Sequence, residues 1–317
     1  MSMMRRTAGV ILGVAAAMML DAAAPPPVPK TGAGRSIVRV PYWMAGAAGP
    51  IIHAKLNGED VKVARLLGPA DDLVILLVLD LAGDLSRVDP ARDALIDHLG
   101  KLPANAMVTL MRSQDGLRVL QDPTTDRAVV QGAIQELTIS GRAALLDTVE
   151  TALAVGDAML AKARVRVAVL YVSDSLVGNY REDFANPVVN SSDSRDMSRR
   201  FPEALIKERM QQVINRAGKT QTPLFIVQLN YESDRLNEAY QTGLIELAAS
   251  TGGEAEFSRT LTEIPVAISR VMERVLGHSS AELEFKRAKA RQWEIELVAE
   301  GTEVKHRTRF LPGGDAK

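Results

Sequence analysis

The sequence predicts an α/β fold of the doubly wound kind, in which a mainly parallel sheet carries one antiparallel edge strand and the two ends of the chain form a small antiparallel β unit. Short apolar runs rich in β-branched residues alternate with stretches of helical periodicity, which indicates βαβ units with helices on both faces of a sheet. An Asp-Gly turn signal interrupts this alternation once. Near both ends, apolar and polar residues alternate with a period of two, as is typical of an antiparallel sheet with one face in water.

Four apolar runs are predicted to form the parallel strands. The first, residues 73–80 (LVILLVLD), ends in a carboxylate and has the pattern of a strand buried on both faces of a sheet. The others are residues 106–111, 165–172 and 222–229. Asp-Gly within residues 112–121 predicts a hairpin that adds the antiparallel edge strand.

Helices are predicted between these strands. Asp89-Pro90 offers an N-cap followed by proline at the first helical position, which predicts a helix from there to about residue 99. Thr125-Asp126 predicts the start of a second helix, which would end near residue 137. Apolar spacing predicts further helices over residues 144–163, 201–217, 237–250 and 261–276.

The start of the chain has the composition of an export signal. Two arginines precede an apolar run over residues 7–20, and small residues follow, so residues 1–24 are predicted to be a signal peptide. The run is shorter than the ~20 apolar residues that span a membrane. An uncleaved N-terminal anchor stays open as an alternative. Pro25 directly follows the Ala-x-Ala site, and a proline at this position hinders cleavage. We therefore expect an exported protein, periplasmic or extracellular.

The remaining chain divides into a linker and three segments. Residues 25–35 form a Pro/Gly linker with nothing to bury. Residues 36–70 are expected to hold short strands, residues 71–278 the α/β domain, and residues 279–317 further strands. Neither terminal set has enough strands to be stable alone, so we expect the two sets to pair in one β unit.

Composition narrows the class of function. The chain has 38 basic and 39 acidic residues and a net charge of -1, so no overall field draws it to nucleic acid or to an anionic membrane. Aromatic residues make up 4%, which argues against a base-stacking surface. The count of cysteines is 0, which excludes disulfides, thiolate ligands and lipid attachment through cysteine. We expect no nucleic-acid partner and no lipid anchor.

Two aspartates mark the candidate site. Asp80 ends the first predicted strand, and Asp174 follows the third parallel strand. Ligands of open parallel sheets bind at the carboxyl ends of the strands, near the point where the strand order reverses. The two side chains should therefore emerge on the same rim of the sheet, although an aspartate at the end of a strand can also simply cap the next loop.

Several phrases recur in an order and spacing typical of one family. They are VLDLAGD at 78–84, VLQDPTTDR at 119–127, SGRAALLDTV at 140–149, VLYVSDS at 169–175 and LAASTGGEAE at 247–256. Together they resemble the von Willebrand factor A (VWA) domain, in particular the secreted VWFA-related group of Acidobacteria and similar bacteria. The resemblance runs from about residue 73 to the C-terminus, and it implies a Rossmann-like sheet and a role in protein binding or adhesion.

The family's metal-ion-dependent adhesion site (MIDAS) holds Mg²⁺ through carboxylate and hydroxyl oxygens. By the resemblance, Asp80 matches its first carboxylate and Asp174 its distal one. Ala82 and Ala143 stand where two hydroxyl ligands belong, and Asp84 stands where the third belongs. Three carboxylates would leave the site net negative and less attractive to a partner's acidic group. The resemblance thus predicts a degenerate site, with no metal or with a weakly bound Mg or Ca ion at Asp80, Asp84 and Asp174.

Arg142 offers another way to hold these carboxylates. Clustered carboxylates raise one another's pKa unless a cation or amide donors compensate. Arg142 precedes the missing hydroxyl by one residue. Its guanidinium could take the metal position and donate charge-assisted hydrogen bonds, or it could point into solvent.

The segment 176–200 is too long and polar for an ordinary connection between a strand and a helix. It follows Asp174, so we expect it over the same rim, either in contact with a partner or disordered. Tyr180, Arg181 and Phe184 are its candidate anchors, because aromatic residues and arginine dominate the cores of protein interfaces.

These observations favour an exported VWA-like interaction or adhesion module, without enzymatic activity, that binds a protein partner at the C-terminal rim of the sheet. One alternative is a metal-dependent hydrolase that uses Asp80, Asp84 and Asp174. Another is a structural subunit of an envelope assembly. The sequence carries no signal for an oligomeric state.

Overall fold

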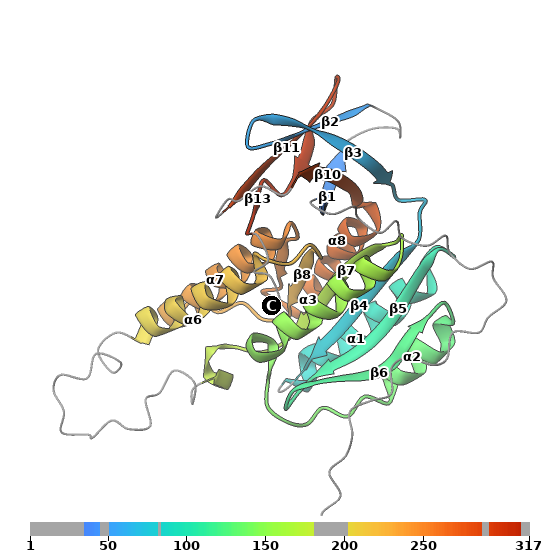
Figure 1. Cartoon of the computed structure of the whole chain (residues 1–317). Helices are drawn as coiled ribbons and strands as arrows, with labels where there is room; N and C mark the ends of the chain where they lie inside the picture. The colour runs from blue at the N-terminus through green and yellow to red at the C-terminus, as the bar shows by residue number, and fades with distance from the viewer. Residues whose placement is uncertain (1–34, 45–50, 82–83, 181–201, 287–291, 312–317) are drawn as a thin grey trace, which may run out of the picture.

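The computed structural model describes residues 35–44, 51–81, 84–180, 202–286 and 292–311, and its central feature is a six-stranded sheet (Figure 1). In spatial order the sheet contains β6 (Leu117–Thr124), β5 (Ala106–Ser113), β4 (Leu73–Asp80), β7 (Arg166–Ser173), β8 (Leu224–Gln228) and β9 (Ala255–Phe257). All neighbouring strands are parallel except β5 and β6. The predicted parallel sheet with one antiparallel edge strand is therefore present, and β9 adds a short strand that was not predicted.

Helices cover both faces of this sheet. The helices α1 (Leu85–Gly100), α2 (Arg127–Gln135) and α8 (Ile264–Gly277) pack on one face, and α3 (Leu145–Lys162), α6 (Pro202–Ala217) and α7 (Arg235–Thr251) pack on the other. The central strand β4 is buried along its whole length, with alternate side chains in the two cores. Successive side chains of a strand point to opposite faces of the sheet, and helices bury both faces here. Every residue of this segment before Asp80 is therefore apolar.

The start of α1 differs from the prediction. The helix begins at Leu85, and the side chain of Asp84 accepts a hydrogen bond from the Ser86 amide, so Asp84 and not Asp89 is the N-cap. Pro90 lies inside the helix. The predicted start at Asp89-Pro90 was wrong because a cap earlier in the chain already satisfies a first-turn amide, and the helix tolerates the amide that Pro90 lacks.

The two ends of the chain pair in a seven-stranded antiparallel sheet. In spatial order it contains β12 (Val304–His306), β1 (Arg35–Met44), β10 (Ser279–Lys286), β3 (Glu59–Leu67), β2 (Ile52–Leu56), β11 (Trp293–Ala299) and β13 (Arg309–Phe310). β1 lies antiparallel to β10, from Arg35 opposite Lys286 to Tyr42 opposite Ser279. Strands from the two termini thus share one apolar core, which supplies the burial that neither set has alone.

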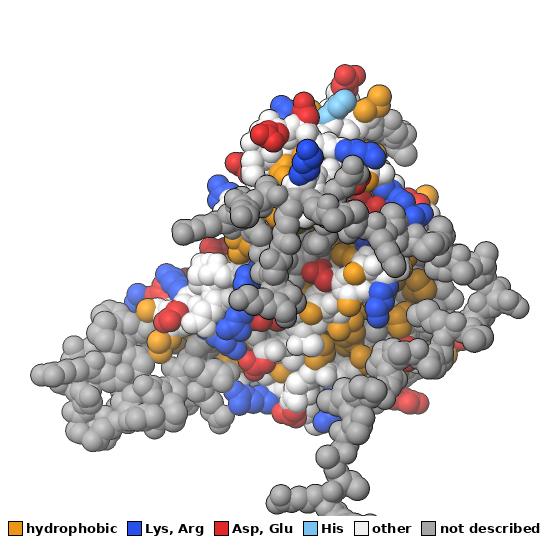
Figure 2. Space-filling view, in the orientation of Figure 1, with side chains coloured by type: hydrophobic (Ala, Val, Ile, Leu, Met, Phe, Trp, Pro, Cys, Tyr) orange, Lys and Arg blue, Asp and Glu red, His pale blue; other side chains and the backbone are white. Residues whose placement is uncertain are grey.

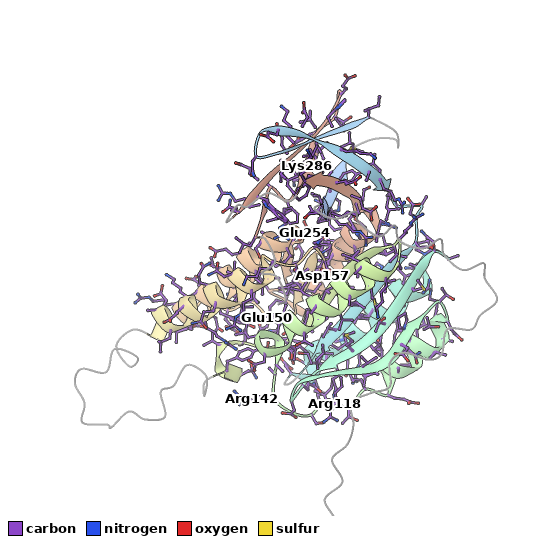
Figure 3. The ribbon with its side chains drawn as sticks, viewed as in Figure 1. Arg118, Arg142, Glu150, Asp157, Glu254 and Lys286 are labelled. Carbon is purple, nitrogen blue, oxygen red and sulfur yellow. The ribbon has the colours of Figure 1, made fainter. Side chains whose placement is uncertain are left out.

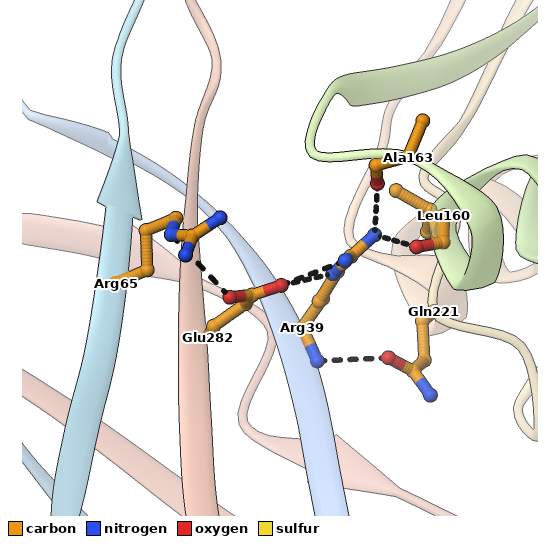
Figure 4. A network of polar contacts seen from close by, with 6 residues as sticks. All are labelled: Arg39, Arg65, Leu160, Ala163, Gln221 and Glu282. Carbon is orange, nitrogen blue, oxygen red and sulfur yellow. Dashed lines mark hydrogen bonds and ion pairs between the residues drawn. The ribbon is translucent and has the colours of Figure 1, made fainter. Parts of the chain in front are cut away.

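A buried arginine connects this sheet to the α/β domain (Figure 4). Nε of Arg39, on β1, donates to Oε1 of Glu282 on β10 at 2.8 Å. Its guanidinium also donates to the carbonyl oxygens of Leu160 and Ala163 at the end of α3. On the other side of Glu282, Arg65 completes an ion pair at 3.8 Å. The charge of Arg39 is therefore compensated by one carboxylate and by carbonyls of the neighbouring domain.

No helix in the described part of the chain is both long and apolar enough to cross a membrane. The predicted signal peptide and most of the predicted linker lie outside the described residues. The same holds for Ala82, for Arg181 and Phe184, and for nearly all of the long segment after Tyr180.

Candidate functional site

The candidate site lies at the carboxyl ends of β4 and β7, which are neighbours in the sheet, with Asp80 opposite Ser173. The chain continues from β4 to β5 on one side, whereas the strands after β7 follow on the other side. The strand order therefore reverses between β4 and β7, where open parallel sheets bind their ligands. Asp80 and Asp174 lie together at this point, since the Asp174 amide donates to the Asp80 carbonyl at 3.3 Å.

Asp80 is fully buried, and the protein satisfies both of its carboxylate oxygens. Oδ1 accepts a hydrogen bond from the Ala144 amide at 2.9 Å. Oδ2 accepts from the hydroxyls of Ser173 at 3.0 Å and Ser175 at 3.1 Å. Burial raises the pKa of Asp80 to about 6, against the opposing effect of these three donors, and the nearby Asp174 raises it further.

Hydroxyl groups extend this network towards the segment after β7. The Ser175 Oγ lies 3.3 Å from the Tyr180 Oη, and the Tyr180 ring packs against Tyr240 of α7 with 5.9 Å between ring centroids. The Gln228 side chain donates to the Ser175 carbonyl at 2.6 Å. Tyr180 ends the short helix η1 (Val177–Tyr180) and is fully buried. In this conformation Tyr180 anchors η1 to the core and is not exposed to a partner.

Asp174 and Asp84 meet through the backbone. Oδ2 of Asp174 accepts a hydrogen bond from the Asp84 amide at 2.9 Å, and Asp174 retains 8% exposure at the rim. The Asp84 carboxylate points instead to α1, where it accepts from the Ser86 amide at 3.0 Å and the Ser86 hydroxyl at 2.6 Å. These bonds, and the charge of Arg87, hold the pKa of Asp84 below its usual value.

The turn before α3 brings a backbone amide to the site. Arg142 and Asp115 are connected by two hydrogen bonds of 3.0 Å, from the Arg142 amide to Asp115 Oδ1 and from the Asp115 amide to the Arg142 carbonyl. The Arg142 side chain is exposed and lies at the same end of the sheet as Arg118 (Figure 3). Ala143 is buried and forms a β-bridge with Gln114. The guanidinium of Arg142 as a substitute for a metal stays a prediction.

The donor set fits a MIDAS-type metal poorly. Mg²⁺ requires near-octahedral oxygen coordination, but Ala143 offers no oxygen beyond its backbone, and the Asp84 carboxylate caps a helix. The hydroxyls of Ser173 and Ser175 are directed at Asp80. In the described part of the chain, no three His, Asp or Glu side chains are arranged to hold a metal ion.

Asp80 and Asp174, predicted from the sequence to lie on one rim, lie together in the structure. The donors to Asp80, which are the Ser173 and Ser175 hydroxyls and the Ala144 amide, were not predicted. The Ser173-Asp174-Ser175 phrase contained a usable signal, because hydroxyl residues on either side of a strand-end aspartate can turn back to the neighbouring strand. The Ala144 amide could not be found in this way, since a backbone donor leaves no trace in residue type.

No protein-family model matches the sequence, and no curated protein does so either. Solved structures with a similar backbone arrangement include a von Willebrand factor type A protein from Catenulispora acidiphila, with a TM-score of 0.45 and 11% identity, over 86% of this chain and 76% of that one. The PilB minor pilin from Streptococcus sanguinis matches with a TM-score of 0.45 and 12% identity, over 68% of this chain and 63% of the pilin.

Proximal thread matrix protein 1 from the mussel byssus is a further match, with a TM-score of 0.43 and 13% identity. The match covers 74% of this chain and 51% of the mussel protein, so the chain spans about half of that protein's length. An aerotolerance-related membrane protein from Bacteroides fragilis matches with a TM-score of 0.37 and 13% identity, over 64% of this chain and 99% of that one.

Proposed function

We propose that this protein is an exported VWA-like module that binds a protein partner at the carboxyl rim of its parallel sheet, without catalytic activity and without a divalent metal. The observation that carries the proposal is the closed hydrogen bonding of Asp80. Its two oxygens accept from Ala144, Ser173 and Ser175, so the carboxylate organises the rim and is not presented to a substrate. The export part of the proposal rests on the composition of residues 1–24.

In this proposal Asp174 contributes an acidic group to the recognition surface. Asp174 is largely buried, with 8% exposure at the rim, and the Asp84 amide fixes one of its oxygens. Arg142 is exposed and lies two residues before Ala144, whose amide donates to Asp80. A partner that presents both a basic and an acidic group would meet Asp174 and Arg142, and such rim charges set specificity and association rate more than raw affinity.

Affinity capture tests this function. The purified chain, without residues 1–24, is immobilised and exposed to an extract of the source cell's envelope proteins in the presence of EDTA. We expect a protein that is captured by the wild type, is lost with Asp174→Lys, and is retained with the matched control Asp93→Lys on the exposed side of α1. Two results would contradict the proposal. One is capture that requires Mg²⁺, and the other is equal capture by the wild type, Asp174→Lys and Asp93→Lys.

The hydrolase alternative has its own test. The wild type and Asp80→Asn are incubated with p-nitrophenyl phosphate and bis-p-nitrophenyl phosphate in the presence of Mn²⁺. We expect no turnover above that of the variant. Turnover that is abolished by Asp80→Asn would instead make the site catalytic.

A further inference from the structure

A cleft of about 400 Å³ lies between α6 and α7, outside the rim described above. Figure 1 shows the two helices side by side, and Figure 2 shows side chains of both charges over them. We call this cleft the α6–α7 groove. Its residues are Glu203, Lys207, Met210 and Gln211 of α6, and Arg235, Glu238, Ala239, Thr242, Gly243 and Glu246 of α7.

The floor of the groove depends on a glycine. A Cβ atom at Gly243 would lie 2.5 Å from Cγ of Met210, so only glycine lets the two helices approach this closely. Met210, Ala239 and Gly243 are buried and leave a narrow apolar floor. A long side chain can lay its methylene groups along such a floor while its charged end stays at the wall.

The charges on the walls are not balanced. Glu203 forms ion pairs with Lys207 at 2.6 Å and with Arg235. Glu238 and Glu246 are both exposed, and neither forms an ion pair within the part of the chain that the structure describes. They lie eight residues apart on one helix, which separates them by roughly 12 Å along its axis. One wall of the groove is therefore acidic at two points, two turns apart.

We propose that the α6–α7 groove binds a basic segment of a partner protein, whose two Lys or Arg side chains meet Glu238 and Glu246. The methylene groups of these side chains lie on Met210, Ala239 and Gly243. Lys207, Gln211 and Thr242 supply donors for the main-chain carbonyls of the segment. A free polyamine has no carbonyl groups to offer these donors and meets the repulsion of Lys207 and Arg235, so we commit to a peptide. The proposal does not depend on recognition at the rim.

Fluorescence anisotropy with synthetic peptides tests the proposal on the full chain. The probe is a labelled 10-residue Thr/Gln peptide with two arginines four positions apart, which lie about 13 Å apart on one face of an extended chain whose carbonyls are free, and the matched peptide has glutamate at both positions. We expect the Arg peptide to bind and the Glu peptide not to bind. The charge reversal Glu238→Lys/Glu246→Lys should weaken the Arg peptide at least about tenfold, and Thr242→Trp should weaken it by filling the groove.

The matched control is Glu136→Lys/Glu303→Lys, which makes the same change of charge at two exposed positions. Glu136 is the C-cap of α2, and Glu303 directly precedes β12. It should keep the affinity of the wild type. Circular dichroism confirms that each variant is folded. Equal binding by the groove and control variants, absence of binding to the wild type, or spermidine binding with the same dependence on Glu238 and Glu246 would each overturn the proposal.

Discussion

At the scale of single residues, Asp80 shows how a buried charge is kept in this fold. An uncompensated buried carboxylate is costly, so it needs donors or a cation. Here one amide and two hydroxyls fill that role, and the hydroxyls come from the neighbouring strand and the residues just beyond it. The same serine hydroxyl, at Ser175, lies next to Tyr180 and so connects the carboxylate to η1.

Ser175→Ala should therefore affect both the carboxylate and η1. The variant leaves Asp80 Oδ2 with one hydroxyl donor, and we expect a loss of about 1–3 kcal/mol in the free energy of unfolding. Ser250→Ala is the matched control, because its hydroxyl donates only to a carbonyl of its own helix. Urea unfolding measures both variants, and equal losses would show that Ser175 has no special role.

His278 gives the stability of the protein a dependence on pH. Burial lowers the pKa of His278 to about 4, and Arg166 lowers it further, while the bond of its Nδ1 to the Val275 carbonyl opposes this. The folded state keeps the ring neutral, whereas the unfolded state takes up a proton near the ordinary value of 6.5. The contribution of His278 to the free energy of unfolding is therefore fully present above about pH 6.5 and is lost as the pH falls towards 4.

The comparison of wild type with His278→Asn isolates this effect. Between about pH 7.5 and about pH 5, we expect the wild type to lose roughly 2 kcal/mol relative to the variant. Urea unfolding at the two pH values measures the difference. Parallel changes in the two proteins would mean that His278 does not titrate as its burial requires.

At the scale of secondary structure, the strands and most helices could be predicted from the sequence. The run 73–80 forms β4 with the predicted bounds, because a strand buried on both faces has one unmistakable pattern. Asp115 and Gly116 have positive φ angles, as the predicted Asp-Gly turn requires. β9 escaped prediction, since a strand of three residues carries too little pattern and is defined by its pairing with β8.

The start of α2 offers a test at this scale. Asp126 caps the helix by accepting from the Ala128 amide at 3.0 Å and the Val129 amide at 3.3 Å. Asp126→Ala should lower the free energy of unfolding by about 1 kcal/mol and speed hydrogen exchange at both amides. Asp122→Ala, at an exposed position of β6, should change neither quantity. Equal exchange rates in the two variants would contradict the role of the cap.

At the scale of the whole molecule, buried arginines connect the sheet of the two termini to the α/β domain. Arg307, after β12, donates to the Thr220 carbonyl at 2.5 Å and to the Gly218 carbonyl after α6. Arg166, at the start of β7, donates to the carbonyls of Pro69 at 2.9 Å and His278 at 2.7 Å, in the segments that connect β3 to β4 and α8 to β10. These contacts could not be predicted, because nothing in the sequence distinguishes an arginine that meets distant carbonyls from one in solvent.

The Arg39–Glu282 pair tests this connection. Each of Arg39→Met and Glu282→Leu should destabilise the protein by about 3–5 kcal/mol, because each leaves a buried charge without its main partner. The double variant should lose less than the sum of the two. The exposed pair Lys55–Glu296, changed in the same way, should cost less than about 1 kcal/mol. Additive losses for Arg39 and Glu282 would contradict their coupling.

At the candidate site, features that depend on residue type could be predicted from the sequence, and features that depend on the folded geometry could not. Asp80 and Asp174 could be placed on one rim, because they end neighbouring apolar strands. The direction of the Asp84 carboxylate and the burial of Tyr180 could not be predicted, since a helix N-terminus and the partner ring of Tyr240 decide them. The three aspartates expected to form one site therefore have different roles. Asp80 is buried within the network, Asp174 accepts from the Asp84 amide, and the Asp84 carboxylate caps α1.

We propose that hydrogen bonds within the chain, and not a metal ion, hold the rim together. Calorimetric titration of the purified chain with Mg²⁺, Mn²⁺ and Ca²⁺ tests it most directly. We predict no heat of binding up to millimolar concentrations and no shift of Tm with any of the three ions. Saturable binding that disappears in Asp80→Asn or Asp174→Asn, together with a rise in Tm, would contradict the claim and restore a metal site at the rim.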